Sequence, residues 1–244
     1  MNHNKHWITP DWPAPANIHA ATTLRTGGVS VTPYDSLNPA THVGDDEDCV
    51  RENRQRIKTM LALPSEPVWL EQTHSNLVIN AGQATTLQQA DASVSDQAGV
   101  VCAVLTADCL PLLICSTDGQ QIAAIHAGWK GLLAGIITNT INVLATTEVL
   151  VWLGPAIGAA CFEVGAEVRE VFVAKSAVFA SAFTQTNTNK YLADIYQLAR
   201  IELATLGIHA VYGGEFCTVT DQARFYSYRR DTQTGRLATL IWRT

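Results

Sequence analysis

Two histidines and one cysteine stand beside turn signals along the chain, and together they could bind a metal ion. His74 lies within residues 72–75, Cys109 within residues 106–111, and His126 directly before an Ala-Gly pair. Zinc accepts two imidazoles and a thiolate, and three protein ligands leave a fourth position open for water or substrate. Such a site lowers the pKa of bound water to about 7. Copper(I) also binds thiolate and imidazole, so the ligand types leave zinc and copper both open.

Cys109 and His126 also suit a second chemistry that needs no metal. A cysteine beside a histidine is the nucleophile–base pair of cysteine hydrolases. Asp108, directly before Cys109, is a candidate catalytic residue or a residue that orients a ligand, and it equally suits the cap of a turn. The ordinary alternative is a buried structural cysteine, because cysteine is among the residue types most often found inside proteins.

A few residues near glycines are candidates for substrate binding. Gly128 opens an expected helix whose free N–H groups could hold an anion, although close helix–sheet packing explains a glycine there equally well. Arg25 and Arg229 are candidate phosphate ligands, since arginine makes bidentate contacts with phosphate. Trp129 could stack on a ligand ring, and His42 could line the site.

The candidate ligands follow elements that must position them. Near-continuous apolar runs predict strands over residues 100–106, 112–115 and 121–126, buried on both faces. A helical pattern follows over residues 128–145. If the strands share one sheet and end at one edge, the three ligands converge there.

The rest of the chain predicts a mixed α/β protein. Further helices are expected over residues 45–61, 162–172 and 191–206. Further strands are expected over residues 68–70, 77–79, 149–153 and 216–219, with a terminal hairpin formed by 225–229 and 237–242. Strands clustered in the middle favour a layered sheet structure, and no linker or repeat divides residues 1–244, which we interpret as a single domain.

Composition excludes several classes of protein. Of the 244 residues 47% are apolar and 16% charged, which excludes extensive disorder. The net charge of −6 and the lack of a basic stripe argue against nucleic acids and anionic membranes as partners. Residues 98–115 are apolar but contain Asp108 and Pro111, which a membrane helix would not tolerate. Six cysteines without a CxxC pair, in a chain with no signal-peptide pattern at residues 1–7, predict reduced thiols and a cytoplasmic location.

The motifs His-Ala-Gly-Trp-Lys-Gly at residues 126–131 and Thr-Ala-Asp-Cys-Leu-Pro at residues 106–111 resemble those of the YfiH-like family. This is the laccase-domain purine nucleoside phosphorylase family, also called polyphenol oxidase. The resemblance extends over nearly the whole chain, through residues 25–30, 34–38, 52–54, 69–72, 152–158, 162–165 and 225–231. Lys130 stands where the family usually has arginine, and Ser75 where it usually has glycine.

The resemblance implies a single-domain, four-layer α/β/β/α sandwich with mixed sheets. It implies a metal site of His74, Cys109 and His126. It also implies a zinc enzyme that phosphorolyses adenosine, inosine and methylthioadenosine and deaminates adenosine, so that the partners are a purine nucleoside and phosphate. The alternatives are a copper-dependent polyphenol oxidase, a hydrolase of cell-wall precursors with Cys109 as nucleophile, and a non-catalytic metal-binding module. The oligomeric state is left open.

Overall fold

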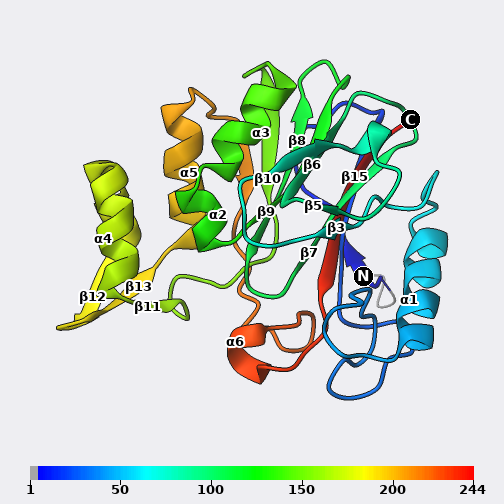
Figure 1. Ribbon diagram of the computed structural model, residues 1–244, viewed down its shortest axis with the longest axis horizontal. Coiled ribbons are helices and arrows are strands. Elements are labelled where there is room, and N and C mark those ends of the chain that lie inside the picture. Colours follow the sequence, from blue (N-terminus) through cyan, green and yellow to red (C-terminus); the bar gives the residue numbers. More distant parts are fainter. Residues whose placement is uncertain (1–4) are drawn as a thin grey trace.

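The computed structural model describes residues 5–244 and arranges them in four layers (Figure 1). Helix α1 (Glu47–Met60) covers one face of a four-stranded sheet, and the other face of that sheet packs on a six-stranded sheet. Helices α2 (Trp129–Leu133), α3 (Ile136–Leu144) and α5 (Ile195–Thr205) cover the far face of the second sheet. The α/β/β/α sandwich is therefore confirmed.

The two large sheets differ in strand direction. The four-stranded sheet is antiparallel throughout and consists, in spatial order, of β1 (Trp7–Ile8), β2 (Ile18–Thr23), β15 (Leu237–Arg243) and β7 (Val101–Thr106). The six-stranded sheet is mixed and consists, in spatial order, of β14 (Val211–Gly213), β10 (Val149–Leu153), β8 (Leu110–Ser116), β9 (Ile122–Ala127), β6 (Ala92–Ser95) and β4 (Val78–Asn80). Its two edge strands, β14 and β4, pair in parallel with their neighbours, and its inner pairs are antiparallel.

Smaller elements complete the chain. A three-stranded antiparallel sheet extends from the body beside α4 (Figure 1). It consists of β11 (Glu163–Gly165), β13 (Lys190–Ala193) and β12 (Phe183–Asn187), and α4 spans Ala166–Lys175. The remaining elements are β3 (Leu70–Glu71) paired with β5 (Gln88–Gln89), the short helix α6 (Tyr228–Asp231), and the 3₁₀ turns η1 (Ala81–Gln83) and η2 (Ala177–Ala182). None of the helices among residues 5–244 combines the length and apolar character needed to cross a membrane.

Strand β7 shows why the central runs are apolar on both faces. Its residues alternate, so that Val101 and Ala103 pack in the cluster beneath α1 while Cys102 and Val104 pack between the sheets. Strands β8 and β9 divide their side chains in the same way between the inter-sheet layer and the helices. The three buried strands are therefore confirmed.

The predicted helix over residues 128–145 is wrong in one respect, because it is two helices. Gly135 adopts φ 84°, in the left-handed region, and separates α2 from α3. The apolar spacing continues across this break, which explains why the pattern alone predicted one helix. As a result α2 has only five residues.

Other predicted elements require correction. The first residues of the predicted helices 162–172 and 191–206 form β11 and β13 instead, and helices α4 and α5 begin only at Ala166 and Ile195. No strand forms over residues 216–219, and residues 225–229 form no hairpin with β15. Strand β15 pairs with β2 and β7 instead. These pairings are long-range, so local turn signals could not reveal them.

Glu202 offers a test of the packing between α5 and α3. Glu202 is 3% exposed, and its carboxylate accepts hydrogen bonds from the hydroxyl and backbone N–H of Thr138. Burial raises the pKa of this carboxyl, so the neutral form stabilises the fold below the unfolded-state pKa of about 4.3. That stability is lost as the pH rises through the folded-state pKa.

We therefore expect Glu202→Gln to increase the free energy of unfolding at pH 8 and to increase it less at pH 5.5. Urea denaturation at the two pH values measures the difference. Glu170→Gln, which removes the same charge from an exposed position on α4, serves as the control and is expected to change little. Equal gains at both pH values would contradict the burial argument.

Candidate metal centre and active site

The three predicted metal ligands come together from three segments. His74 follows β3, Cys109 lies in the turn between β7 and β8, and His126 belongs to β9. Pairing of β8 with β9 places Pro111 opposite His126, which brings the preceding turn with Cys109 alongside. His74 Nε2 lies 3.7 Å from Cys109 Sγ, and the ligand atoms of all three residues lie within 4.8 Å of one another. The three ligands therefore converge, but their strands do not share one sheet as expected. Strand β7 belongs to the four-stranded sheet, β8 and β9 to the six-stranded sheet, and β3 to a separate two-stranded sheet.

Backbone strain accompanies the cluster. His74 has φ 60° and Asp108 has φ 86°, although neither is glycine. Such conformations cost about 1–3 kcal/mol each and persist only where the surroundings fix them. Here the backbone N–H of His74 donates to Asp91, and the backbone oxygen of Asp108 accepts from Ile157 N–H. The strained residues are therefore the candidate ligand His74 and Asp108, the residue directly before the candidate ligand Cys109.

Asp91 is the buried support of the site. Its carboxylate is 0% exposed, accepts backbone N–H bonds from Thr73, His74 and Ser75 and a hydroxyl bond from Ser75, and lies 2.7 Å from His126 Nδ1. Burial opposes its ionisation, but the hydrogen bonds from His126 and Ser75 outweigh burial and lower the pKa of the carboxyl to about 2. A carboxylate on Nδ1 fixes the ring and leaves Nε2 as the ligand atom.

The hydroxyl of Ser75 adds one donor to Asp91, which a glycine at this position would lack. Ser75 therefore contributes to the support beneath the ligands.

Cys109 and His126 favour their charged forms together. Burial opposes the ionisation of Cys109, but the neighbouring His126 and His74 lower the pKa of the thiol. Burial likewise opposes protonation of His126, but Cys109 and Asp91 raise the pKa of the imidazole. A thiolate is the form in which cysteine binds a metal or acts as a nucleophile.

The cluster opens into a cavity of about 500 Å³, which we call the His–Cys–His cavity. Its walls are formed by His42, Gln72, His74, Leu105, Thr106, Ala107, Asp108, Cys109, His126, Trp129, Lys130, Ile157, Phe162, Ile195, Tyr228, Arg229 and Arg236. The volume and the mixture of aromatic and polar walls are typical of a small-molecule site. The predicted substrate-binding residues His42, Trp129 and Arg229 therefore line this cavity.

Positive charge is concentrated in this cavity. Lys130, Arg229 and Arg236 line it, and none of the three forms an ion pair within the described chain. The guanidinium groups of Arg229 and Arg236 donate only to backbone carbonyls, so neither charge is neutralised by a direct ion pair. The wall therefore suits an anion, although the chain as a whole carries a net charge of −6.

Asp108 is the one carboxylate in the cavity wall, and both its oxygens are already engaged. Oδ1 accepts from the Thr218 hydroxyl, and Oδ2 accepts from the backbone N–H of Arg229 at 2.6 Å. Asp108 therefore ties the turn that carries Cys109 to the segment that carries Arg229.

The predicted anion site at Gly128 requires correction. Helix α2 begins at Trp129 and has only five residues, which provide little dipole. The glycine instead gives room to the ligands, because a Cβ on Gly128 would lie 2.8 Å from His74 Cδ2 and 3.1 Å from Cys109 Sγ. The structure therefore favours close packing over an anion site as the reason for glycine at residue 128, and the packing is against the metal-competent side chains.

Arg25 lies away from the cavity, which is a second correction. Its guanidinium pairs with the Asp35 carboxylate at 3.2 Å, donates to the Gln222 carbonyl and stacks on Tyr226. With its charge already compensated, Arg25 holds two loops together.

Two important residues were missed by the sequence analysis. Asp91 had a signal, since a single carboxylate between Ala90 and Ala92, just before a buried strand, requires a buried partner. Arg236 had none, because it falls between the predicted turn at residues 231–235 and the predicted strand over residues 237–242.

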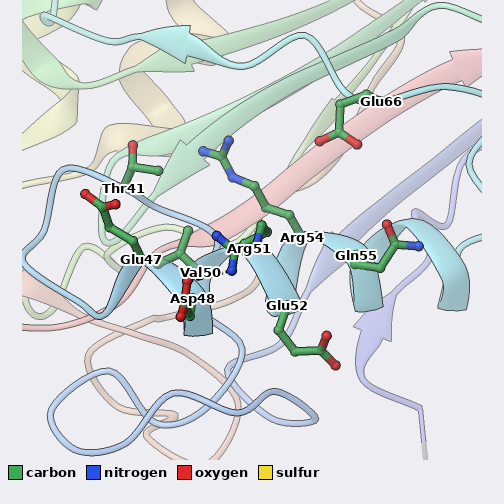
Figure 2. Close-up of a pocket in the computed structure, with 9 residues that line it drawn as sticks. All are labelled: Thr41, Glu47, Asp48, Val50, Arg51, Glu52, Arg54, Gln55 and Glu66. Carbon is green, nitrogen blue, oxygen red and sulfur yellow. Dashed lines mark hydrogen bonds and ion pairs between the residues drawn. The ribbon is translucent and has the colours of Figure 1, made fainter.

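A larger groove of about 840 Å³ runs along α1, but its residues offer no comparable chemistry (Figure 2). It is lined by Thr41, Glu47, Asp48, Val50, Arg51, Glu52, Arg54, Gln55 and Glu66. Figure 2 shows that most of these side chains extend from α1, whereas Glu66 reaches the groove from a separate segment. The ion pair of Arg51 with Asp48 is exposed, and exposed pairs contribute at most about 1 kcal/mol.

Comparison with known proteins identifies the family. A family model described as "Multi-copper polyphenol oxidoreductase laccase" matches residues 19–244. The chain belongs to this family. Within the laccase family, the purine nucleoside phosphorylase YfiH of Shigella flexneri is 52% identical over 238 residues, which are 96% of this chain and 98% of the relative. A purine nucleoside phosphorylase of Pseudomonas aeruginosa, PA4543, is 52% identical over 239 residues, 97% of this chain and 98% of its own.

Solved structures of similar proteins share the fold. The crystal structure of Neisseria meningitidis protein NMB0706, of family DUF152, matches with a TM-score of 0.95 and 48% identity, over 98% of this chain and 99% of its own. YlmD from Geobacillus stearothermophilus matches with a TM-score of 0.89 and 29% identity, over 100% of this chain and 98% of its own. These matches confirm the resemblance to the YfiH-like family that the sequence motifs indicated.

Proposed function

We propose that this laccase-family protein is a zinc-dependent purine nucleoside phosphorylase acting on adenosine, inosine and methylthioadenosine. The observation that carries the proposal is the His–Cys–His cavity, whose wall combines three cationic side chains that form no ion pair with a cluster of metal-competent ligands. The names of the relatives in Shigella and Pseudomonas support the same reaction class.

The residues present fit a metal ion. The ligand set is two imidazoles and a thiolate. The Asp91 carboxylate holds His126 through Nδ1, an arrangement that is common for histidines that bind metals. His74, Cys109 and His126 would hold the ion. When bound, zinc supplies a Lewis acid that polarises an oxygen of water or substrate.

The cavity walls provide for both substrates. Lys130, Arg229 and Arg236 would bind phosphate through their N–H groups, with the planar guanidinium groups giving bidentate contacts. Trp129, Phe162 and Tyr228 are aromatic walls on which a purine ring can stack. His42 is available as a neutral donor or acceptor, because burial and the nearby Arg236 lower the pKa of its imidazole.

The reaction requires positioning and charge stabilisation. A phosphate oxygen forms a bond to the anomeric carbon of the ribose, the glycosidic bond breaks, and the purine leaves with the bonding electrons and accepts a proton. Cations around phosphate hold the nucleophile against the ribose and compensate the charge that moves. Hydrolytic deamination of adenosine, which releases ammonia and inosine, is the second activity that we assign to the same cavity.

The direct test is incubation of zinc-loaded protein with inosine and phosphate. We expect hypoxanthine and ribose 1-phosphate, and neither product from a Cys109→Ala variant or from protein treated with a chelator. Adenosine in phosphate-free buffer tests deamination by the appearance of inosine. The absence of ribose 1-phosphate above the Cys109→Ala level would refute the phosphorolysis proposal.

Arg236 gives a sharper prediction about phosphate. Arg236→Lys keeps the positive charge but loses the planar guanidinium that can donate two parallel hydrogen bonds to phosphate. The KM for phosphate is therefore expected to rise about 10-fold or more, while the KM for inosine stays close to wild type. Arg200→Lys is the matched control, because Arg200 also donates only to backbone carbonyls but lies outside the His–Cys–His cavity. Equal KM values for phosphate in the two variants would contradict the assignment.

Two alternative activities have some support. The family description names copper, yet residues 5–244 hold a single cluster of metal-competent side chains with three ligands, too few for several copper ions. Copper-dependent oxygen uptake with a phenol would favour oxidase activity.

The lowered pKa of Cys109 also suits a metal-free hydrolase acting on cell-wall precursors. That reading predicts activity that survives removal of zinc and is lost on alkylation of Cys109.

We further propose that residues 1–244 act as one domain and that the protein works in the cytoplasm. All six cysteines are unpaired, as expected in a reducing compartment.

A further inference from the structure

A pair of cysteines outside the metal cluster borders a second cavity. Cys161 and Cys217 both line a hollow of about 450 Å³ between residues 158–161 and 214–220, and both are partly exposed. They are distant in sequence, and the proposed phosphorolysis uses neither sulfur. Hydrogen peroxide is small enough to reach a partly exposed sulfur.

The two sulfurs lie on segments that are in close contact. Gly158 N–H donates to Cys217 Sγ at 3.3 Å, and Cys161 N–H donates to Gly158 O at 2.9 Å. A Cβ on Gly158 would lie only 3.1 Å from Cys217 Sγ, so the absence of a side chain lets the turn approach the sulfur. Gly158 therefore contacts both the Cys217 sulfur and the backbone of Cys161.

The surroundings shift the pKa values of the two thiols in opposite directions. Burial opposes the ionisation of Cys217, but donors from the Thr220 hydroxyl and from the backbone N–H groups of Thr220, Gly158 and Val219 outweigh it and lower the pKa of the thiol. Burial and the contact with Cys217 raise the pKa of the Cys161 thiol. A stabilised, accessible thiolate beside a second thiol is typical of a redox-sensing cysteine with its resolving partner.

We infer that Cys217 and Cys161 form a peroxide-responsive disulfide site, with Cys217 as the sulfur that reacts first. The Cys217 thiolate attacks one oxygen of hydrogen peroxide, so that an S–O bond forms, the O–O bond breaks, and hydroxide leaves and takes up a proton. The Cys161 sulfur then attacks Cys217, the S–S bond forms, the S–O bond breaks, and water leaves. In sum, two thiols and one peroxide give one disulfide and two waters.

The bond would join two segments directly behind the His–Cys–His cavity. Thr218, next to Cys217, donates to Asp108, and the carbonyl of Cys161 accepts from Arg229. Both contacts lead to the cavity wall. The modification site is nevertheless separate from the metal ligands, and the inference does not depend on the proposed reaction.

Peptide mapping of the zinc-loaded protein tests the site. After treatment with stoichiometric hydrogen peroxide and alkylation of free thiols, we expect a disulfide between the peptides containing Cys161 and Cys217, reversed by dithiothreitol. Cys161→Ser is expected to leave a persistent sulfenic acid at Cys217 that dimedone traps, and Cys217→Ser to abolish both products.

Cys49 serves as an internal control. It is partly exposed like the other two, but burial and the adjoining Asp46 raise the pKa of its thiol. We therefore expect it to be oxidised more slowly than Cys217 in the same sample. Oxidation of Cys49 at an equal rate, or unoxidised Cys161 and Cys217 in folded wild-type protein, would overturn the inference.

Discussion

Replacing Asp91 with asparagine is expected to weaken zinc binding by about 10–100-fold and to lower the free energy of unfolding by about 3 kcal/mol or more. The carboxylate accepts hydrogen bonds from three successive backbone N–H groups, from the Ser75 hydroxyl and from His126. An amide NH₂ group cannot accept any of them, so at least one buried donor faces another donor. The left-handed backbone at His74 then loses the contacts that hold it.

The two losses can be measured separately. Competition with a chromogenic chelator gives the zinc affinity, and urea denaturation of the chelator-treated protein gives the stability without metal. Asp118→Asn is the matched control, because Asp118 also accepts from a hydroxyl and a backbone N–H but lies in the exposed turn between β8 and β9, at the end of these strands opposite to Cys109 and His126. Wild-type zinc affinity in the Asp91→Asn protein would show that His126 does not need its carboxylate partner.

The contrast between Asp91 and the three ligands shows what the sequence could predict. His74, Cys109 and His126 stand beside turns that follow apolar runs, and strand pairing within one sheet suffices to bring Cys109 to His126. The same apolar runs predicted the buried strands, because the alternation in β7 is hidden when both faces are covered. Local pattern and family motif agree at these positions.

The failures lie where long-range pairing decides the outcome. Residues 225–229 have strand-like composition, yet Phe225 and Tyr226 pack in a small buried cluster with Leu237 and leave β15 to pair with β2. In this arrangement Arg236, directly before β15, lies in the wall of the His–Cys–His cavity. No local signal distinguishes the two arrangements, since both satisfy the same turn residues.

Gly128→Ala is expected to weaken zinc binding by about 10-fold or more and to reduce phosphorolysis correspondingly, while the metal-free protein stays nearly as stable as wild type. The backbone of Gly128 has φ −64° and ψ 161°, which alanine adopts without strain. The effect of the substitution is therefore steric. The added Cβ would lie 2.8 Å from His74 Cδ2, closer than packed carbon atoms allow. His74 is exposed, so its ring moves away from Cys109 and the fold itself is spared.

Gly131→Ala separates this effect from the general loss of a glycine in the same segment. Its added Cβ would lie 3.1 Å from the Ser75 backbone oxygen and does not approach a ligand side-chain atom. Cobalt substitution gives a direct readout, because the thiolate–cobalt absorption reports the bond to Cys109. We expect that absorption to persist in Gly131→Ala and to require more cobalt in Gly128→Ala. Equal cobalt titrations for the two variants would mean that His74 tolerates the methyl group in place, and the steric account of Gly128 would then fail.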